Sequence, residues 1–214
     1  PLFRTFLRGS FVESMKIDII GNGSFGTFLR EILPPFFDLD DTAETVIFAV
    51  PISAYESLAS ENRNKHLVNV CSVQKPSMEM MLRHTANVTG IHPLFGQRTP
   101  ADRRNAILTH RVSRESPFAE AEREFIEGFA KVSKLIETDH NGVVFTPDSH
   151  DRLMAKTHVA AVLAAKQMKV FVERADGIPD EFLPNSFRLM RDFVRTLDDM
   201  PQGTIESIMA NPDL

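Results

Sequence analysis

The sequence predicts an α/β fold, in which a mostly parallel sheet with flanking helices spans residues 15–145 and a small all-helical domain spans residues 146–214. Short apolar runs alternate with helical patterns as far as residue 137, which is typical of a parallel sheet with helical crossovers. From Thr146 onward the periodicity is helical throughout. The chain has 214 residues, 43% hydrophobic and 25% charged, which are ordinary values for a globular protein.

Composition also excludes several classes of protein. No window approaches 18 consecutive apolar residues, so we expect no transmembrane helix and no membrane partner. The 24 Lys and Arg residues against 29 Asp and Glu residues leave a formal charge of −5, which argues against a nucleic-acid partner held by bulk charge. Cys71 is the single cysteine, and no Cys/His cluster has the spacing of a metal site. We expect a soluble, reduced, cytoplasmic protein with a small-molecule partner.

The first elements follow a short N-terminal segment. Residues 1–14 are basic and apolar but interrupted by arginines, and we interpret them as an extension or a remnant of an added segment. Residues 16–20 then form an apolar run that predicts a strand, and a glycine-rich turn follows at once. A helix is expected next, from the pattern Phe28, Leu29, Ile32 and Leu33, and Pro34 ends it.

The remaining strands are expected at short apolar runs, and the helices where apolar residues recur every three or four positions. Thr146-Pro147-Asp148 is expected to begin the helical domain, with Thr as the cap and Pro in the first turn. We predict strands at residues 46–50, 66–73, 87–91, 107–112 and 134–137, and helices at residues 53–60, 77–84, 118–132, 146–171, 184–197 and 202–209.

The glycine-rich turn has the spacing of a dinucleotide-binding fingerprint. Gly21-x-Gly23-x-x-Gly26 lies directly between a strand and a helix, which is the context that this motif requires. The first glycine permits a tight turn, the second lets a pyrophosphate approach the backbone, and the third lets the helix pack closely on the strand. The motif predicts a Rossmann-like domain that binds NAD or NADP. The expected cofactor-binding residues are Gly21, Asn22, Gly23, Ser24, Phe25, Gly26, Val50 and Pro51.

The segment after this motif predicts a shortened nucleotide-binding half. The fingerprint expects an acidic residue about 20 positions on, at the end of a second strand, to hold the adenosine ribose. The residues between Gly26 and the strand at 46–50 leave no room for a full strand–helix–strand unit, which needs at least ~10–12 residues for its crossover. Asp38, Asp40 and Asp41 are the acids at hand, and we interpret each as part of a solvated loop.

A second motif delivers a histidine at the end of a strand. Residues 87–96 read NVTGIHPLFG, and Pro93 restricts His92 to an extended backbone. Together with VNVCSVQK at 68–75, GNGSFG at 21–26 and TPDSHDRLMAKTH at 146–158, this phrase resembles the prephenate and arogenate dehydrogenases of tyrosine biosynthesis. The resemblance covers residues 15–209, in the order that the family has.

The resemblance implies an NAD(P)-dependent oxidative decarboxylation of prephenate or arogenate. His92 would take the hydroxyl proton of the substrate, which suits an imidazole near neutral pH, and Ser72 matches the family's serine beside that hydroxyl. His158 and Arg188 match substrate-binding positions, with Arg191 and Arg195 as alternatives to Arg188. The adjacent His150 and Asp151 match a pair that we interpret as structural, and Ala161 stands where relatives often carry a histidine. Relatives dimerise through the helical domain, which predicts a homodimer here.

Two other interpretations remain open from the sequence. A β-hydroxyacid type of dehydrogenase would use a lysine on the helix between the domains, and Lys156 is available there, although HPLFG has no role in that scheme. The shortened nucleotide half and Ala161 also fit a degenerate, non-catalytic member that binds a small metabolite or a partner. His92 and Ser72 favour an enzyme.

Overall fold

The computed structural model describes residues 14–214, so the predicted extension at 1–14 lies outside the described residues except for Ser14. These residues form one sheet with the strand order β2-β1-β3-β4-β5-β6-β7. Neighbouring strands are parallel except for β5 and β6, which are antiparallel. This topology confirms the predicted α/β, mostly parallel fold. The strands are β1 (Lys16–Ile20), β2 (Asp38–Leu39), β3 (Thr45–Phe48), β4 (His66–Asn69), β5 (Val88–Pro93), β6 (Asn105–His110) and β7 (Lys134–Ile136).

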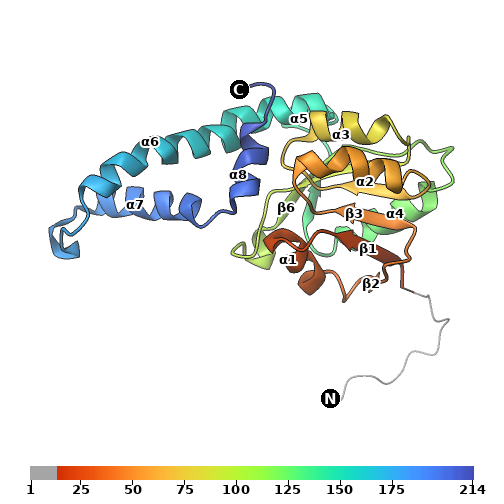
Figure 1. The fold of residues 1–214 in the computed structure, drawn as a ribbon, viewed down its shortest axis with the longest axis horizontal. Coiled ribbons are helices and arrows are strands. Elements are labelled where there is room, and N and C mark those ends of the chain that lie inside the picture. The colour runs from red at the N-terminus through yellow and green to blue at the C-terminus, as the bar shows by residue number, and fades with distance from the viewer. Residues whose placement is uncertain (1–13) are drawn as a thin grey trace, which may run out of the picture.

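Helices cover both faces of the sheet (Figure 1). The helices α1 (Ser24–Ile32) and α4 (Ala119–Phe129) pack on one face, and α2 (Tyr55–Glu61) and α3 (Gln74–Leu82) pack on the other. Successive side chains of a strand point to opposite faces, so Ile47 joins the core under α1 and α4, whereas Val46 and Phe48 join the core under α2 and α3. Short 3-10 turns lie at Ile52–Ala54, Ala101–Arg103 and Asp180–Phe182.

The segment after the glycine motif corrects one expectation. A strand–helix–strand unit does fit there, because α1 has only nine residues and β2 only two. β2 pairs with the first two residues of β1, Lys16 with Asp38 and Ile17 with Leu39. β2 therefore ends three residues before β1 reaches its carboxyl end at Ile20. The nucleotide-binding half is shortened as predicted, but by truncation of the second strand rather than by its absence.

The C-terminal third of the chain is helical. Thr146 caps α5 (Pro147–Met154) through a capping box with Ser149, and the helix continues through a π-helical turn (Ala155–Val159) into α6 (Ala160–Arg174). The predicted single helix at 146–171 thus contains a π turn. α6 and α7 (Asn185–Asp198) form a hairpin that projects away from the sheet, and α8 (Gln202–Met209) returns toward it (Figure 1).

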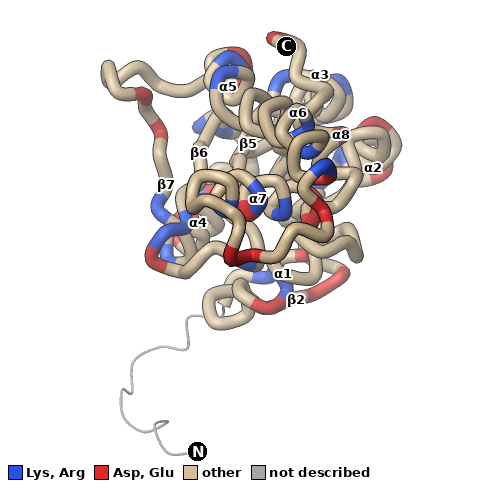
Figure 2. The backbone as a smooth tube through the Cα atoms, turned by 90° about the vertical axis from the view of Figure 1, so that its left-hand side faces the viewer, with Lys and Arg blue, Asp and Glu red and all other residues tan. Residues whose placement is uncertain are grey.

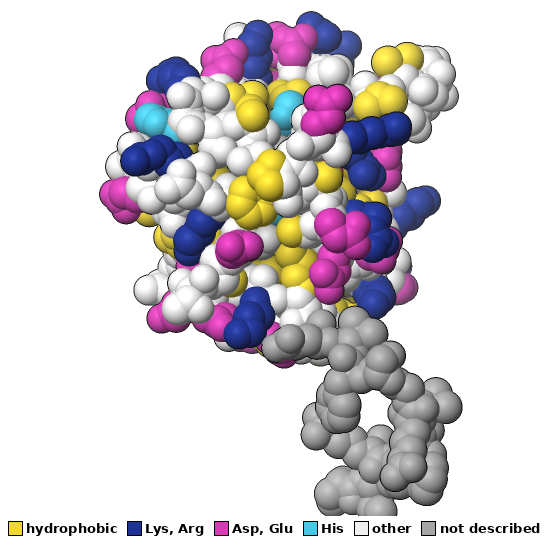
Figure 3. All heavy atoms as spheres, turned by 90° about the vertical axis from the view of Figure 1, so that its right-hand side faces the viewer, with side chains coloured by type: hydrophobic (Ala, Val, Ile, Leu, Met, Phe, Trp, Pro, Cys, Tyr) yellow, Lys and Arg dark blue, Asp and Glu magenta, His cyan; other side chains and the backbone are white. Residues whose placement is uncertain are grey.

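The surface carries charges of both signs. Lys and Arg are interspersed with Asp and Glu on the side of the molecule from which the hairpin projects (Figure 2) and on the opposite side (Figure 3). Large apolar side chains are exposed on the hairpin and its loop, namely Leu163, Val170, Phe171, Ile178, Phe182, Leu189 and Phe193. Within residues 14–214, no helix combines the length and the apolar character needed to cross a bilayer.

Candidate active site

The glycine loop joins β1 to α1 at the carboxyl edge of the sheet. Gly21 has φ of 124°, and a Cβ there would lie 2.1 Å from the carbonyl oxygen of Ala49. A Cβ at Gly26 would lie 2.3 Å from the carbonyl oxygen of Gly21. Arg30 also stabilises the loop. Its guanidinium donates to the carbonyl oxygen of Ile19 and, at 2.6 Å, to that of Gly21. Only glycine fits at positions 21 and 26.

Gly23 differs from these two glycines because it faces open space. It is the N-cap residue of α1, which has no side-chain cap, and no heavy atom lies within 4 Å of where a Cβ would be. The first N–H groups of a helix have no partner within the helix and attract anions. The loop therefore has the shape of a cradle for a pyrophosphate, in which a Cβ at position 23 would occupy part of the space.

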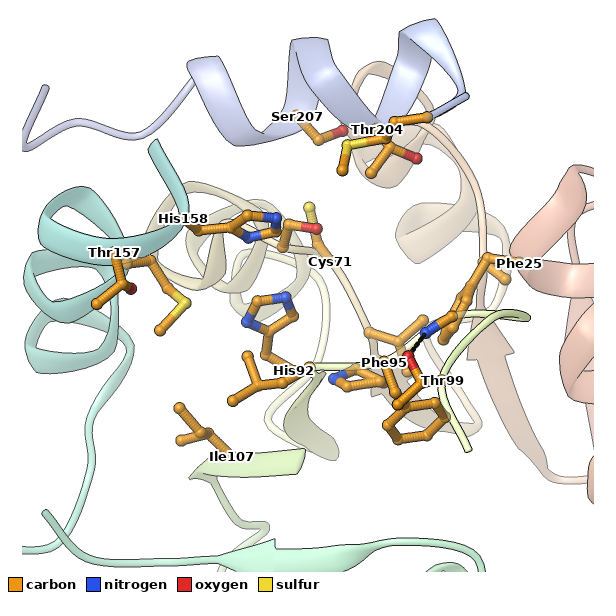
Figure 4. Close-up of a pocket in the computed structure, with 18 of the residues that line it drawn as sticks. Phe25, Cys71, His92, Phe95, Thr99, Ile107, Thr157, His158, Thr204 and Ser207 are labelled. Atoms are coloured by element: carbon orange, nitrogen blue, oxygen red, sulfur yellow. Dashed lines mark hydrogen bonds between the residues drawn. The ribbon is translucent and has the colours of Figure 1, made fainter. Parts of the chain in front are cut away.

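A cavity of about 1180 Å³ opens beside this loop. The carboxyl ends of β3, β4 and β5 form its floor, the π-helical turn forms one wall, and α8 covers it with Thr204 and Ser207 (Figure 4). Ligand sites typically measure ~300–1,000 Å³, so the cavity has room for more than one small molecule. Much of its wall is apolar, including Phe25, Phe95 and Ile107.

His92 lies at the end of β5, at the inner wall of the cavity. Its side chain is 98% buried, and its Nδ1 is hydrogen-bonded to Nε2 of His150 at 2.8 Å. The ring of His158 stacks on it with centroids 6.0 Å apart (Figure 4). Burial, together with the neighbouring His150 and His158, holds the pKa of His92 well below its usual range. Burial and His150 also lower the pKa of His158. His92 is thus a neutral imidazole at physiological pH.

His150 is in turn connected to Asp151. The Nδ1 of His150 lies 2.7 Å from Oδ1 of Asp151, and both side chains are fully buried. The backbone N–H groups of Gln74 and Lys75 donate to the two oxygens of Asp151, each at 2.8 Å. Our sequence interpretation treated this pair as structural and missed its contact with His92. The adjacent His150 and Asp151 near the start of a predicted helix were visible in the sequence. Their contact with His92 depends on the fold and could not be predicted from that pattern.

The structure brings together most of the predicted site residues. Those in the cavity wall are Gly23, Ser24, Phe25, Val50, Pro51, Ser72, His92 and His158, while Gly21 and Gly26 form the base of the loop. Asn22 is exposed and does not contribute to the cavity wall. The sequence reasoning missed Cys71, whose thiol also lines the cavity and whose pKa burial raises to about 11.

Arg188 does not reach the cavity of its own chain. It lies on α7, and its Nη2 donates to the carbonyl oxygen of Asp180 at 2.6 Å. Within residues 14–214, Arg98 is the Lys or Arg residue that lines the cavity, and its exposed side chain forms an ion pair with Asp199 at 2.7 Å. Lys156 is exposed and outside the cavity wall, so the arrangement does not favour a lysine-based site. In the described part of the chain, no group of His, Cys, Asp and Glu is arranged to hold a metal ion.

The acidic residues after the glycine loop, Asp38, Asp40 and Asp41, do not line the cavity. Asp40 follows β2, but its amide donates to the carbonyl oxygen of Ile17, near the start of β1 rather than at its end. Its carboxylate accepts from the N–H and hydroxyl of Thr42 and pairs with Lys16 at 3.0 Å. These contacts hold the pKa of Asp40 well below its usual range. Asp40 therefore stabilises the turn after β2.

Three solved structures share this fold at low sequence identity. One is a candidate prephenate dehydrogenase from Corynebacterium glutamicum, with a TM-score of 0.65 and 14% identity over 91% of this chain and 74% of the other. Another is a prephenate dehydrogenase from A. aeolicus in complex with hydroxyphenyl propionate and NAD+, with a TM-score of 0.61 and 13% identity over 94% and 84%. The third is an arogenate dehydrogenase from Synechocystis, with a TM-score of 0.56 and 17% identity over 92% and 84%. No protein-family model and no curated protein sequence matches the chain.

Proposed function

We propose that this chain is an NAD- or NADP-dependent dehydrogenase that oxidatively decarboxylates prephenate or arogenate. The observation that carries the proposal is the placement of His92 in the wall of the cavity that the glycine loop also lines. A buried base beside a loop shaped for a pyrophosphate is the pairing that an alcohol oxidation with a nicotinamide needs. The three structural neighbours support the same substrate class.

The residues at the glycine loop fit a dinucleotide in part. Gly23, Ser24 and Phe25 border the space where a pyrophosphate would sit, and Val50 and Pro51 extend that wall from the end of β3. A bound nicotinamide would supply the acceptor for a hydride. No acid of β2 or of the turn after it lines the cavity, so the adenosine end would be held less firmly. We infer that most of the binding comes from the pyrophosphate and nicotinamide ends.

His92 would act as the proton acceptor. With a nicotinamide bound as the hydride acceptor, His92 would take the hydroxyl proton as the hydride leaves the carbinol carbon of the substrate. Carbon dioxide would leave the opposite ring carbon, its bonding electrons would complete the aromatic ring, and the resulting phenolate oxygen would regain the proton from His92. The depressed pKa of His92 keeps it unprotonated and ready to accept. Ser72, half-buried in the same wall, would hydrogen-bond the hydroxyl, and its position in the cavity wall supports this role. The apolar wall would exclude water and hold the ring.

The substrate's carboxylates need cationic partners, because arginine binds carboxylates with paired hydrogen bonds. Arg98 lines the cavity with an exposed side chain, and exchange of Asp199 for a substrate carboxylate would preserve its charge balance. The position of His158 in the cavity wall, beside His92, supports a substrate role for it. A role for Arg188 stays a prediction, since the single chain gives it no contact with the cavity.

We also propose a homodimer through the α6–α7 hairpin. The exposed apolar residues on this hairpin, among them Phe171, Phe182 and Leu189, make a surface that a second copy would cover. Light scattering after size-exclusion chromatography would give twice the chain mass for a dimer.

Calorimetric titration with NAD+ and then NADP+ tests the main proposal, followed by a turnover assay with prephenate and with arogenate. Heat is the preferred signal because the chain contains no Trp. Micromolar binding of either dinucleotide, with turnover of one substrate, is the expected result. The shortened β2 favours one alternative, a non-catalytic protein that binds a small metabolite. Absence of dinucleotide binding, even with substrate present, would establish that alternative in place of the dehydrogenase.

A further inference from the structure

We propose that Asp151 and His150 form a hydrogen-bonded relay that fixes the tautomer of His92, so that the Nε2 of His92 faces the cavity without a proton. The relay links three elements, since Asp151 and His150 lie on α5, Asp151 is bound by the start of α3, and His92 ends β5. Its catalytic consequence rests on the proposed function, but the tautomer itself is a property of the protein alone.

Asp151 is oriented by the backbone at the start of α3. Its two carboxylate oxygens accept hydrogen bonds from the backbone N–H groups of Gln74 and Lys75, each at 2.8 Å. A backbone N–H can only donate, and the N-terminus of α3 favours a negative charge. The carboxylate is therefore held as an ionised acceptor. The Nδ1 of His150, which lies 2.7 Å from Oδ1 of Asp151, must carry a proton and donate it.

The proton on Nδ1 of His150 determines which ring nitrogen of His92 carries a proton. A neutral imidazole has one donor nitrogen and one acceptor nitrogen, so a His150 that donates through Nδ1 accepts through Nε2. That Nε2 lies 2.8 Å from Nδ1 of His92, which must then be the donor. The proton of neutral His92 is consequently on Nδ1, and its Nε2 keeps a lone pair. Within residues 14–214, no hydrogen bond is made to this Nε2.

The surroundings of His92 add no competing hydrogen bond. The titratable groups in contact with its ring are His150 and the stacked ring of His158. The same cavity is also lined by Cys71, Arg98, Asp139, His140 and Asp199, none of which has a hydrogen bond to His92. The backbone is also fixed, because His92 pairs with Ile107 across the antiparallel β5–β6 ladder and Pro93 follows. The ring is thus oriented by the sheet, and its proton is positioned by the relay.

The relay gives the proposed proton transfer a definite course. The hydroxyl proton of the substrate moves to Nε2 of His92, while the Nδ1 proton stays in its hydrogen bond to His150. The resulting imidazolium is then stabilised by His150 and, through it, by the carboxylate of Asp151. His150 and Asp151 are positioning residues in this scheme, since neither touches the substrate.

Nitrogen NMR of the 15N-histidine-labelled protein, without any ligand, tests the inference directly. A protonated and an unprotonated ring nitrogen have well-separated 15N shifts, and the His92 signals are those that His92→Asn removes. We expect the full-length wild-type protein to show a protonated Nδ1 and an unprotonated Nε2 at His92. A proton on Nε2 of His92, or a doubly protonated His150 that donates to His92, would overturn the relay.

A pair of variants tests whether His150 is the cause. His150→Phe keeps a ring of similar size but removes the acceptor, so the proton of His92 should move from Nδ1 to Nε2. His158→Phe is the matched control, because it replaces a ring that stacks on His92 without a hydrogen bond to it, and the tautomer should stay. If His92 keeps its Nδ1 proton in His150→Phe, the relay is wrong. If His150→Phe does not fold, the wild-type spectrum still decides.

Kinetics provide a second readout that depends on the proposed function. His150→Phe should lose much of the ~10²–10⁴-fold contribution of a general base to kcat while KM changes little, and the acid limb of the pH profile should shift. A wild-type protein that turns over neither substrate would reject the proposed function and leave the tautomer result intact. A shifted tautomer with unchanged kcat and an unchanged pH profile would reject the catalytic role of the relay.

Discussion

Lowering the pH from 7 to 5 should destabilise the protein through His66, a histidine far from the cavity chemistry. His66 is fully buried in β4 between two threonines, with Nδ1 3.2 Å from Oγ1 of Thr45 and Nε2 2.8 Å from Oγ1 of Thr89. The hydroxyl of Thr89 donates to Glu122 at 2.5 Å. Because the hydroxyl proton of Thr89 is donated to Glu122, Thr89 accepts from Nε2 of His66, and in the neutral ring Nδ1 accepts from the hydroxyl of Thr45. An imidazolium would have to turn the hydroxyl proton of Thr45 away from the ring, and its charge would be fully buried.

The size of the effect follows from the pKa of His66. Burial lowers this pKa from 6.5 to about 4. The unfolded chain therefore binds a proton below about pH 6.5 that the folded chain does not bind until about pH 4, so stability is full above this window and falls as the pH drops through it. Proton linkage between the ordinary pKa of 6.5 and the folded pKa of about 4 lowers the free energy of unfolding by about 2 kcal/mol between pH 7 and pH 5.

Guanidinium unfolding followed by far-ultraviolet circular dichroism at both pH values measures the loss. His92, His110 and His158 also have lowered pKa values, so the wild-type protein should lose more than His66 alone accounts for. The variant His66→Gln keeps a polar side chain between the threonines and should reduce the pH-dependent loss by about 2 kcal/mol. His140→Gln, at an exposed position, controls for the removal of one histidine. A loss as large in His66→Gln as in the wild type would refute the reasoning.

The other predictions concern the cavity and the hairpin. His92→Asn should lower kcat by ~10²–10⁴-fold with little change in dinucleotide Kd, and unchanged turnover would remove His92 from the mechanism. Gly23→Ala should leave the melting temperature nearly unchanged yet weaken dinucleotide binding, because its Cβ meets no protein atom but enters the cradle. Gly26→Ala should lower the melting temperature clearly, since its Cβ would lie 2.3 Å from the carbonyl oxygen of Gly21; equal melting curves for the two glycine variants would contradict this distinction. Phe182→Ser with Leu189→Ser should convert a dimer to a monomer in light scattering, and a dimer mass that persists would move the interface elsewhere.

The parts of the site that sequence reasoning located are those with local causes. The glycine loop follows from the turn that Gly21 and Gly26 make possible, and the position of His92 follows from a strand ended by Pro93. β2 was not located because two residues have no periodicity to detect. The π-helical turn at Ala155–Val159 was missed for a related reason, since its residues continue an ordinary helical pattern.

The contacts that sequence reasoning missed connect residues far apart in the chain. His92 and His150 are 58 positions apart, and Gln74 and Asp151 are 77 positions apart. No local pattern specifies such pairs, because they depend on how β5, α3 and α5 meet at the sheet edge. Arg188 illustrates the converse, a residue placed at the site by resemblance alone, which the fold puts on the projecting hairpin with Asp180 as its partner.

The two-residue β2 has a consequence for the size of ligand that this site would prefer. A dinucleotide is two mononucleotides joined through their phosphates, and the truncated β2, which pairs only with the first two residues of β1, offers little to hold the adenosine one. The adenosine half would then add little binding free energy for its size. The binding free energy per non-hydrogen atom should therefore be higher for a smaller ligand than for a dinucleotide. Nicotinamide mononucleotide should therefore retain a larger share of the affinity of NAD+ here than in dehydrogenases with a full second strand. A fragment library aimed at this protein would best begin from that half-molecule.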